Sequence, residues 1–174
     1  SAARRRRGED LSFDELRQLI GDLVDMGTTN ITFTGGEPLL RQDLPDLVAC
    51  VDRDRAITQV FTSGAVCDES LISELAERGL FALQVSLDSP NPAEHDKLRG
   101  VKGLFDKAIA LIEEALKRGL LVGISTYASP EHIRSGALDE MYRLGSELGV
   151  HEITVFDLVP TGALIGEKPF LSEE

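Results

Sequence analysis

Two glycines followed by a glutamate and a proline form the segment of the sequence best suited to ligand binding, Gly35-Gly36-Glu37-Pro38. Glycines let the backbone approach a ligand closely and leave its N–H and C=O groups available. Glu37 adds a carboxylate, which attracts an ammonium group and disfavours a phosphate. The segment therefore predicts a site for an amine or a zwitterion. The alternatives are that Glu37 only caps its own turn or pairs with Arg41.

Short polar segments follow five β-rich runs of the chain. Turns favour Gly, Ser, Asp and Pro, which explains any one of these segments but explains all five less well. Asp88 and Asp157 lie in two of them and are candidates for a substrate acid or base, or for turn caps. The five segments are residues 34–38, 62–64, 86–89, 126–127 and 157–160.

Helical and strand patterns alternate along the chain and must position these segments. Ser12 and Glu15 predict a capping box at the start of the first helix, which Gly27 ends. Strands separated by helices pair in parallel, and such sheets bind ligands at the carboxyl ends of their strands. Further helices are expected near residues 44–52, 69–78, 104–118 and 136–148, and strands near 31–34, 58–62, 82–87, 121–126 and 152–156.

The predicted fold class is α/β, with parallel strands in a barrel, a partial barrel or an open doubly wound sheet. About five strands are too few to close a barrel. We therefore expect a partial (β/α) barrel whose first strand precedes Ser1, and we interpret the chain as a fragment.

Composition narrows the class of protein. The chain has 174 residues, enough for one domain with a sizeable core, and no apolar run approaches the ~20 residues of a membrane span. It has no signal-peptide pattern, so we expect a cytoplasmic protein. The formal charge of -12 argues against a nucleic-acid surface, and the basic run Arg4–Arg7 is interpreted as a solvated flank.

The sequence contains two cysteines, Cys50 and Cys67, whose spacing fits no metal motif. Cys50 lies in an apolar helical segment and is expected in the core. Cys67 follows a strand and a turn, and nothing nearby marks it as a nucleophile. Both are interpreted as structural.

Several segments resemble motifs of radical S-adenosylmethionine (SAM) enzymes. Gly35-Gly36-Glu37-Pro38 is similar to the GGEP motif, which ends a barrel strand in that family. Further segments resemble later motifs in the same order, and the nearest members are the molybdenum-cofactor-synthesis-like and the peptide-modifying (SPASM-type) enzymes. These segments are residues 61–64, 85–89, 95–100 and 156–162.

The resemblance implies a role for each matched residue. Glu37 would bind the amino group of the methionine moiety of SAM, Arg99 its carboxylate and Ser86 a polar edge. Val159 belongs to a segment that would lie against adenine. The implied SAM-binding residues are Gly35, Gly36, Glu37, Pro38, Thr62, Ser63, Ser86, Asp88, Arg99 and Val159.

The resemblance also implies a chemistry. In the family, three cysteines hold a [4Fe–4S] cluster, and reductive cleavage of SAM yields a 5′-deoxyadenosyl radical that abstracts hydrogen from substrate. The implied partners are a small-molecule or peptide substrate, such as a cofactor precursor, and an electron donor such as flavodoxin or ferredoxin.

Two departures from the family pattern stand out, apart from Ser63 in place of Asn in the third-strand motif. The C-x-x-x-C-x-x-C loop is absent, so we expect the cluster ligands upstream of Ser1. The strand end at residues 125–130 lacks the Asn that often follows it in the family, which affects the implied contacts with adenine and substrate. We expect a basic flank at 1–10, the radical SAM core at 11–162 and the start of a C-terminal extension at 163–174. Two alternatives are a non-catalytic scaffold barrel that has lost the cluster and an unrelated α/β domain that binds phosphate or sugar.

Overall fold

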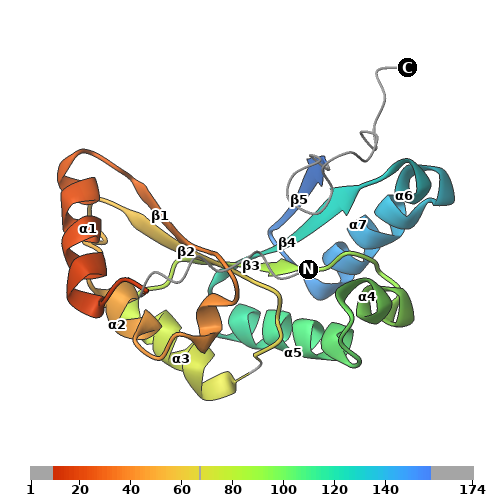
Figure 1. Cartoon of the computed structure of the whole chain (residues 1–174). Coiled ribbons are helices and arrows are strands. Elements are labelled where there is room, and N and C mark those ends of the chain that lie inside the picture. Colours follow the sequence, from red (N-terminus) through yellow and green to blue (C-terminus); the bar gives the residue numbers. More distant parts are fainter. Residues whose placement is uncertain (1–9, 67, 158–174) are drawn as a thin grey trace.

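The sheet of the protein has five parallel strands in the order β1-β2-β3-β4-β5, and it curves into an open trough (Figure 1). The computed structural model describes residues 10–66 and 68–157. This parallel α/β partial barrel confirms the fold predicted from the alternating pattern. The strands are β1 (Asn30–Phe33), β2 (Ile57–Thr62), β3 (Ala82–Ser86), β4 (Leu121–Ala128) and β5 (Glu152–Asp157).

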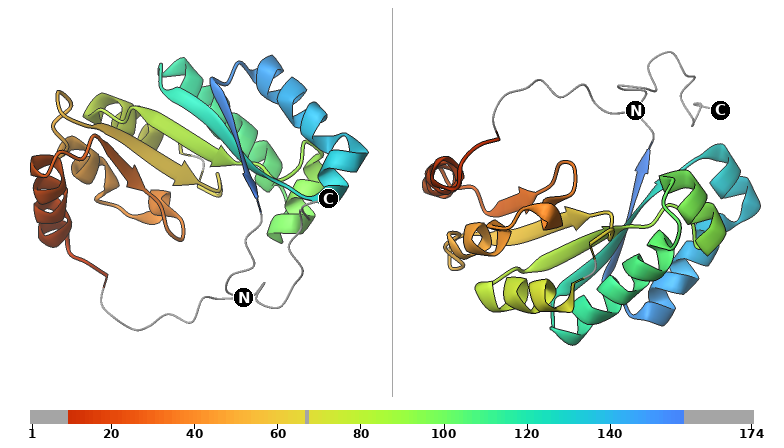
Figure 2. Two further views of the ribbon diagram at one scale, coloured as in Figure 1. Left: turned by 90° about the horizontal axis from the view of Figure 1, so that it is seen from above. Right: turned by 60° about the horizontal axis from the view of Figure 1, so that its bottom comes forward.

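The helices cover the convex side of the trough and leave the concave side open (Figure 2). The capping box of Ser12 and Glu15 is present, and Gly79 ends α3 as predicted. The helices are α1 (Phe13–Asp25), η1 (Pro38–Leu40), α2 (Leu44–Ala49), α3 (Glu69–Arg78), α4 (Pro92–Arg99), α5 (Leu104–Lys117), α6 (Pro130–Ser135) and α7 (Ala137–Leu148).

Alternate strand residues face the helices and form the core. Val60, Leu83 and Val122 are fully buried in the main cluster, and a smaller cluster lies between α1, α2 and β1. The neighbouring strand positions face the trough. There Gln84 lies across Gly123, where a Cβ would come within 2.4 Å of the Gln84 amide. A glycine is therefore needed at position 123 to seat this buried polar side chain.

The structure differs from the predicted elements in several places. β1 ends at Phe33 rather than at residue 34, β4 continues to Ala128, and β3 ends one residue early. Helix α2 ends at Ala49, so Cys50 lies at its C-cap and is partly exposed. The prediction that Cys50 lies in the core is therefore wrong. Cys67 lies outside the described residues.

Two α-helices, α4 and α6, were not predicted. Each begins with a side-chain cap followed by proline, namely Asn91-Pro92 and Ser129-Pro130. Both signals are favourable for a helix start, but the helices are too short to show a clear apolar period. Over residues 10–66 and 68–157, no helix combines the length and apolar character needed to cross a membrane.

Candidate functional site

A pocket of about 230 Å³ lies at the carboxyl ends of the strands. Three of the predicted binding residues, Ser86, Asp88 and Arg99, line it together. The parallel register places Ser86, the last residue of β3, beside Ser125 within neighbouring β4, and both side chains line the pocket. The other lining residues were not among the predicted binding residues, although all of them lie in segments that the sequence analysis singled out; they are Phe61, Ser125, Thr126, Tyr127 and Phe156.

The carboxylate of Glu37 is bound to the end of the neighbouring strand β2. Its Oε1 accepts a hydrogen bond from Thr62 Oγ1 at 2.7 Å and one from Leu39 N at 3.2 Å. Its Oε2 accepts hydrogen bonds from Ser63 N at 2.9 Å and from Ser63 Oγ at 2.5 Å. A carboxylate has about four acceptor positions, so donors of its own chain occupy this one. We call this arrangement the Glu37 clamp.

The clamp bears on two of the readings of Glu37. The bond from Leu39 N makes Glu37 the cap of η1, but the bonds from Thr62 and Ser63 show that it does more than cap its own turn. Pairing with Arg41 is wrong, because Arg41 Nε lies 2.6 Å from Asp43 Oδ1. Gly35 has φ +136°, a backbone conformation that residues with a side chain rarely adopt. A Cβ built at this position would meet no atom of the described residues within 4 Å. The backbone of this loop is therefore exposed to a ligand.

The carboxyl ends of the strands form the mouth of the site, with the Glu37 clamp after β1 and β2. After β3, Asp88 and Arg99 form an ion pair with two contacts. Arg99 Nε lies 2.5 Å from Asp88 Oδ2, and Arg99 Nη2 donates to Asp88 Oδ1 at 2.7 Å. Such a paired arrangement fixes the plane of the guanidinium group. A guanidinium carries five N–H donors, so the edge with Nη1 remains available for a second carboxylate.

A buried histidine binds the backbone of Asp88, one member of this ion pair. His95 is 0% exposed, and its Nδ1 accepts a hydrogen bond from the backbone N–H of Asp88 at 3.1 Å. Its ring meets Phe105 edge-on, with centroids 6.0 Å apart. Burial is the main cause that lowers the pKa of His95, and the Asp88 carboxylate opposes it. The ring is therefore held in its neutral form.

Asp96, the next residue of α4, caps a different helix. Helix α5 begins at Leu104, and its N-cap residue Gly103 has no side chain to cap it. Asp96 accepts hydrogen bonds from the backbone N–H groups of Gly103 and Phe105, and these bonds lower the pKa of its carboxyl. His95 and Asp96 thus fasten α4 to the end of β3 and to the start of α5. Sequence reasoning noted both residues only as part of a motif, although the uncapped Gly103 was visible.

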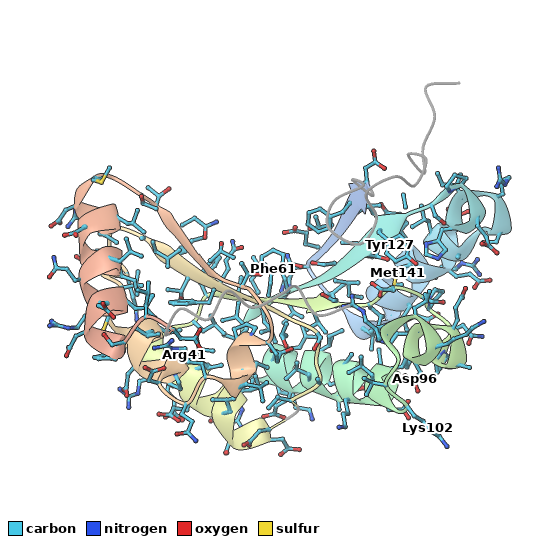
Figure 3. The ribbon with its side chains drawn as sticks, viewed as in Figure 1. Arg41, Phe61, Asp96, Lys102, Tyr127 and Met141 are labelled. Atoms are coloured by element: carbon cyan, nitrogen blue, oxygen red, sulfur yellow. The ribbon has the colours of Figure 1, made fainter. Side chains whose placement is uncertain are left out.

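The wall of the pocket that faces the trough is aromatic. Figure 3 shows Phe61 and Tyr127 on the concave side of the sheet. The Tyr127 ring lies 4.8 Å from the ring of His132, and burial raises the pKa of its phenol. Beside it, the buried Thr126 Oγ1 has no hydrogen-bond partner among residues 10–66 and 68–157. An aromatic wall beside polar groups suits a ligand with both an apolar ring and charged ends.

The two cofactors implied by the motifs fit this chain differently. The pocket joins a charged pair, an aromatic wall and an unpartnered hydroxyl, which suits the zwitterionic and ring portions of SAM. A [4Fe–4S] cluster needs thiolate ligands, and the chain has two cysteines. The described residues also contain no group of three or more metal-ligating side chains. This chain by itself therefore does not fit the cluster. Val159, the last predicted site residue, lies outside the described part of the chain.

Known proteins share both the sequence and the fold. The Fe-coproporphyrin III synthase of Methanosarcina barkeri is 33% identical over 153 residues, which cover 88% of this chain and 38% of that relative. The PqqA peptide cyclase of Rhizobium meliloti is 27% identical over 147 residues, which cover 84% of this chain and 39% of that relative. The chain thus spans about two fifths of the length of these relatives.

A solved structure agrees with the fold. Streptococcus suis SuiB bound to S-adenosylmethionine superimposes with a TM-score of 0.69 at 19% identity, covering 80% of this chain and 32% of SuiB. At this identity the likeness concerns the fold. The family match is direct, because residues 1–134 match the Radical SAM superfamily. The chain belongs to the radical SAM superfamily.

Proposed function

We propose that this chain is the SAM-binding core of a radical SAM enzyme. The observation that carries the proposal is the Asp88–Arg99 pair, which lines the pocket at the carboxyl ends of the strands. Carboxylate ligands are well matched by a guanidinium group whose plane is already fixed. SAM carries an amine, a carboxylate and an aromatic base. These groups suit the Gly35–Gly36 loop, the Arg99 guanidinium group and the aromatic wall, respectively.

The loop of Gly35 and Gly36 would take the amine of SAM. Because the Glu37 carboxylate is occupied by Thr62, Ser63 and Leu39, we assign the amine to the backbone carbonyl groups of the loop. Glu37 then holds the loop in place and adds negative charge nearby, which favours an ammonium group.

Arg99 would hold the carboxylate of SAM with the guanidinium edge that Asp88 leaves available. Ser86 lines the same pocket and offers a hydroxyl to a polar edge of the ligand. The adenine ring would lie against the aromatic wall of Phe61, Tyr127 and Phe156, because aromatic faces favour stacked or edge-on partners. These residues bind and orient the ligand, which is the contribution that a protein makes to cofactor chemistry.

When bound beside a reduced [4Fe–4S] cluster, SAM supplies a 5′-deoxyadenosyl radical that abstracts hydrogen from a substrate. Three thiolates would have to come from residues other than Cys50 and Cys67, and an electron donor such as flavodoxin or ferredoxin would reduce the cluster. The names of the two relatives suggest a peptide or a cofactor precursor as substrate. The cysteine count also favours a second candidate, a SAM-binding barrel without radical chemistry of its own.

The proposal is tested by titrating the 174-residue chain with SAM in a calorimeter. We expect saturable binding of one SAM per chain, and we expect Arg99→Ala to weaken it about tenfold. The matched control is Arg118→Ala, which removes a similar ion pair, with Glu114, next to the amino end of β4. Absence of SAM binding by the wild-type chain, or equal losses in both variants, would contradict the proposal.

A further inference from the structure

We infer that His95 is a positioning residue for SAM binding, which acts through the backbone of Asp88 on the guanidinium group of Arg99. The inference rests on the proposed function and extends it to a residue that does not line the pocket. It starts from an unusual feature of the site, a fully buried imidazole that accepts a backbone hydrogen bond directly beneath an ion pair.

The first step is the direction of the hydrogen bond. Because His95 Nδ1 accepts from Asp88 N, the ring must be neutral and must carry its proton on Nε2. Nε2 is buried and has no partner within the described ranges. The charged groups that bear on the ring are Asp88, Arg99 and Asp96. The buried position, rather than a second hydrogen bond, keeps the ring neutral.

The second step is the transfer from Asp88 to Arg99. The same residue that gives its N–H to His95 gives both carboxylate oxygens to Arg99. A shift of the Asp88 backbone therefore moves both contacts of the guanidinium group together. Arg99 is also the last residue of α4, and Gly100 ends that helix in the left-handed conformation at φ +69°. Arg99 is thus held by its own helix end and by Asp88.

The third step is that α4 cannot adjust freely if His95 is lost. Asp96 accepts hydrogen bonds from the backbone N–H groups of Gly103 and Phe105, which fasten α4 to the start of α5. With the helix fastened, loss of the His95 contact releases the Asp88 side of the pair. The competing reading is that His95 only fills space against Phe105. That reading predicts lower thermal stability with no specific change in the affinity for SAM.

Three substitutions at His95 separate the two readings by calorimetric titration with SAM. His95→Leu removes the acceptor and keeps an apolar side chain, and we expect it to weaken SAM binding about fivefold. His95→Asn places an oxygen near the position of Nδ1, and we expect binding within about twofold of wild type. His95→Gln places its oxygen near the position of Nε2 instead, so it should behave like Leu. If Leu does not fold, the contrast of Asn with Gln still tests the inference.

The matched control is His151→Leu. His151 Nδ1 also accepts a backbone hydrogen bond at 3.1 Å, from Val122 near the amino ends of the strands and away from the pocket. We expect this variant to bind SAM as the wild type does. Equal weakening in His151→Leu, or the same affinity in the Asn and Gln variants of His95, would overturn the inference.

A double-mutant cycle identifies the route of the effect. In an Arg99→Ala background, His95→Gln should change SAM affinity by less than about twofold, because the group that it positions is gone. A full fivefold loss in that background would mean that His95 does not act through Arg99. Failure of the proposed function would look different, because wild-type protein would then not bind SAM at all.

Discussion

The Glu37 clamp and the Asp88–Arg99 pair hold a charged side chain in opposite ways. On the Gly35–Glu37 side, the Glu37 carboxylate is consumed by donors of its own chain and its loop presents backbone. On the α4 side, Asp88 takes one edge of the Arg99 guanidinium and leaves the other edge available. In the proposed function, the charge of Glu37 shapes the loop and the charge of Arg99 binds the ligand. A charged residue in a motif can therefore serve either purpose, and only its partners distinguish them.

The largest effect is expected from breaking the Glu37 clamp with Glu37→Gln. The amide turns one acceptor into a donor, which then opposes a donor such as Ser63 N or Thr62 Oγ1. We expect the free energy of unfolding to fall by about 2 kcal/mol and SAM affinity to fall about tenfold. Chemical denaturation and calorimetry on the same variant measure the two quantities.

Thr62→Val sharpens this result, because it removes one clamp donor and leaves the carboxylate. If Glu37 holds the loop, SAM binding should weaken about threefold. If Glu37 binds the amine directly, freeing one of its oxygens should leave SAM binding unchanged or make it tighter, and the clamp assignment would be wrong.

An effect smaller than that of Glu37→Gln, but larger than that of Thr62→Val, is expected on the α4 side from Asp88→Asn. The substitution keeps the size of the side chain but removes the charge that fixes Arg99, so the guanidinium group gains freedom. We expect SAM affinity to fall about fivefold while unfolding changes by less than about 1 kcal/mol, because the pair is partly exposed. A tighter SAM complex in Asp88→Asn would show that Asp88 only competes for Arg99.

The smallest effect is a pH dependence of stability that belongs to the α4 side. The pKa of His95 is lowered from its ordinary value of 6.5, mainly by burial. The unfolded chain therefore takes up a proton first, and the free energy of unfolding decreases as the pH falls from about 6.5 through the folded pKa. Denaturation series at several pH values should show a smaller decrease in His95→Asn. An equal decrease in both proteins would assign it to other groups.

Much of the fold could be predicted from the sequence. The apolar periods predicted all five strands to within a few residues, and the Gly79 cap and the Ser12–Glu15 box were correct. The short helices α4 and α6 were missed because a helix of two turns shows little periodicity. Cys50 was misplaced because the apolar pattern continued past the point at which α2 ends.

The membership of the candidate site was predictable only in part, and its contacts were not predictable. Ser86 and Asp88, expected from the strand ends, and Arg99, implied by the family resemblance, meet in one pocket, whereas the predicted residues of segments 35–38 and 62–63 do not line it. Two partners of Glu37, Thr62 and Ser63, lie 25 and 26 positions away at the end of another strand, and no local pattern indicates that distance. The positioning role of His95 could not be predicted either, because the sequence does not distinguish a buried histidine from an exposed one.

The strand order described above has a consequence for how the chain folds. Each strand pairs with the next along the chain, so every pairing in the sheet closes a loop of fewer than about 40 residues. A parallel sheet usually folds slowly because it joins distant segments. Here the chain can add one strand and its helix at a time to a growing edge. Strand addition in that order would let the early pairs form during synthesis, before β5 leaves the ribosome.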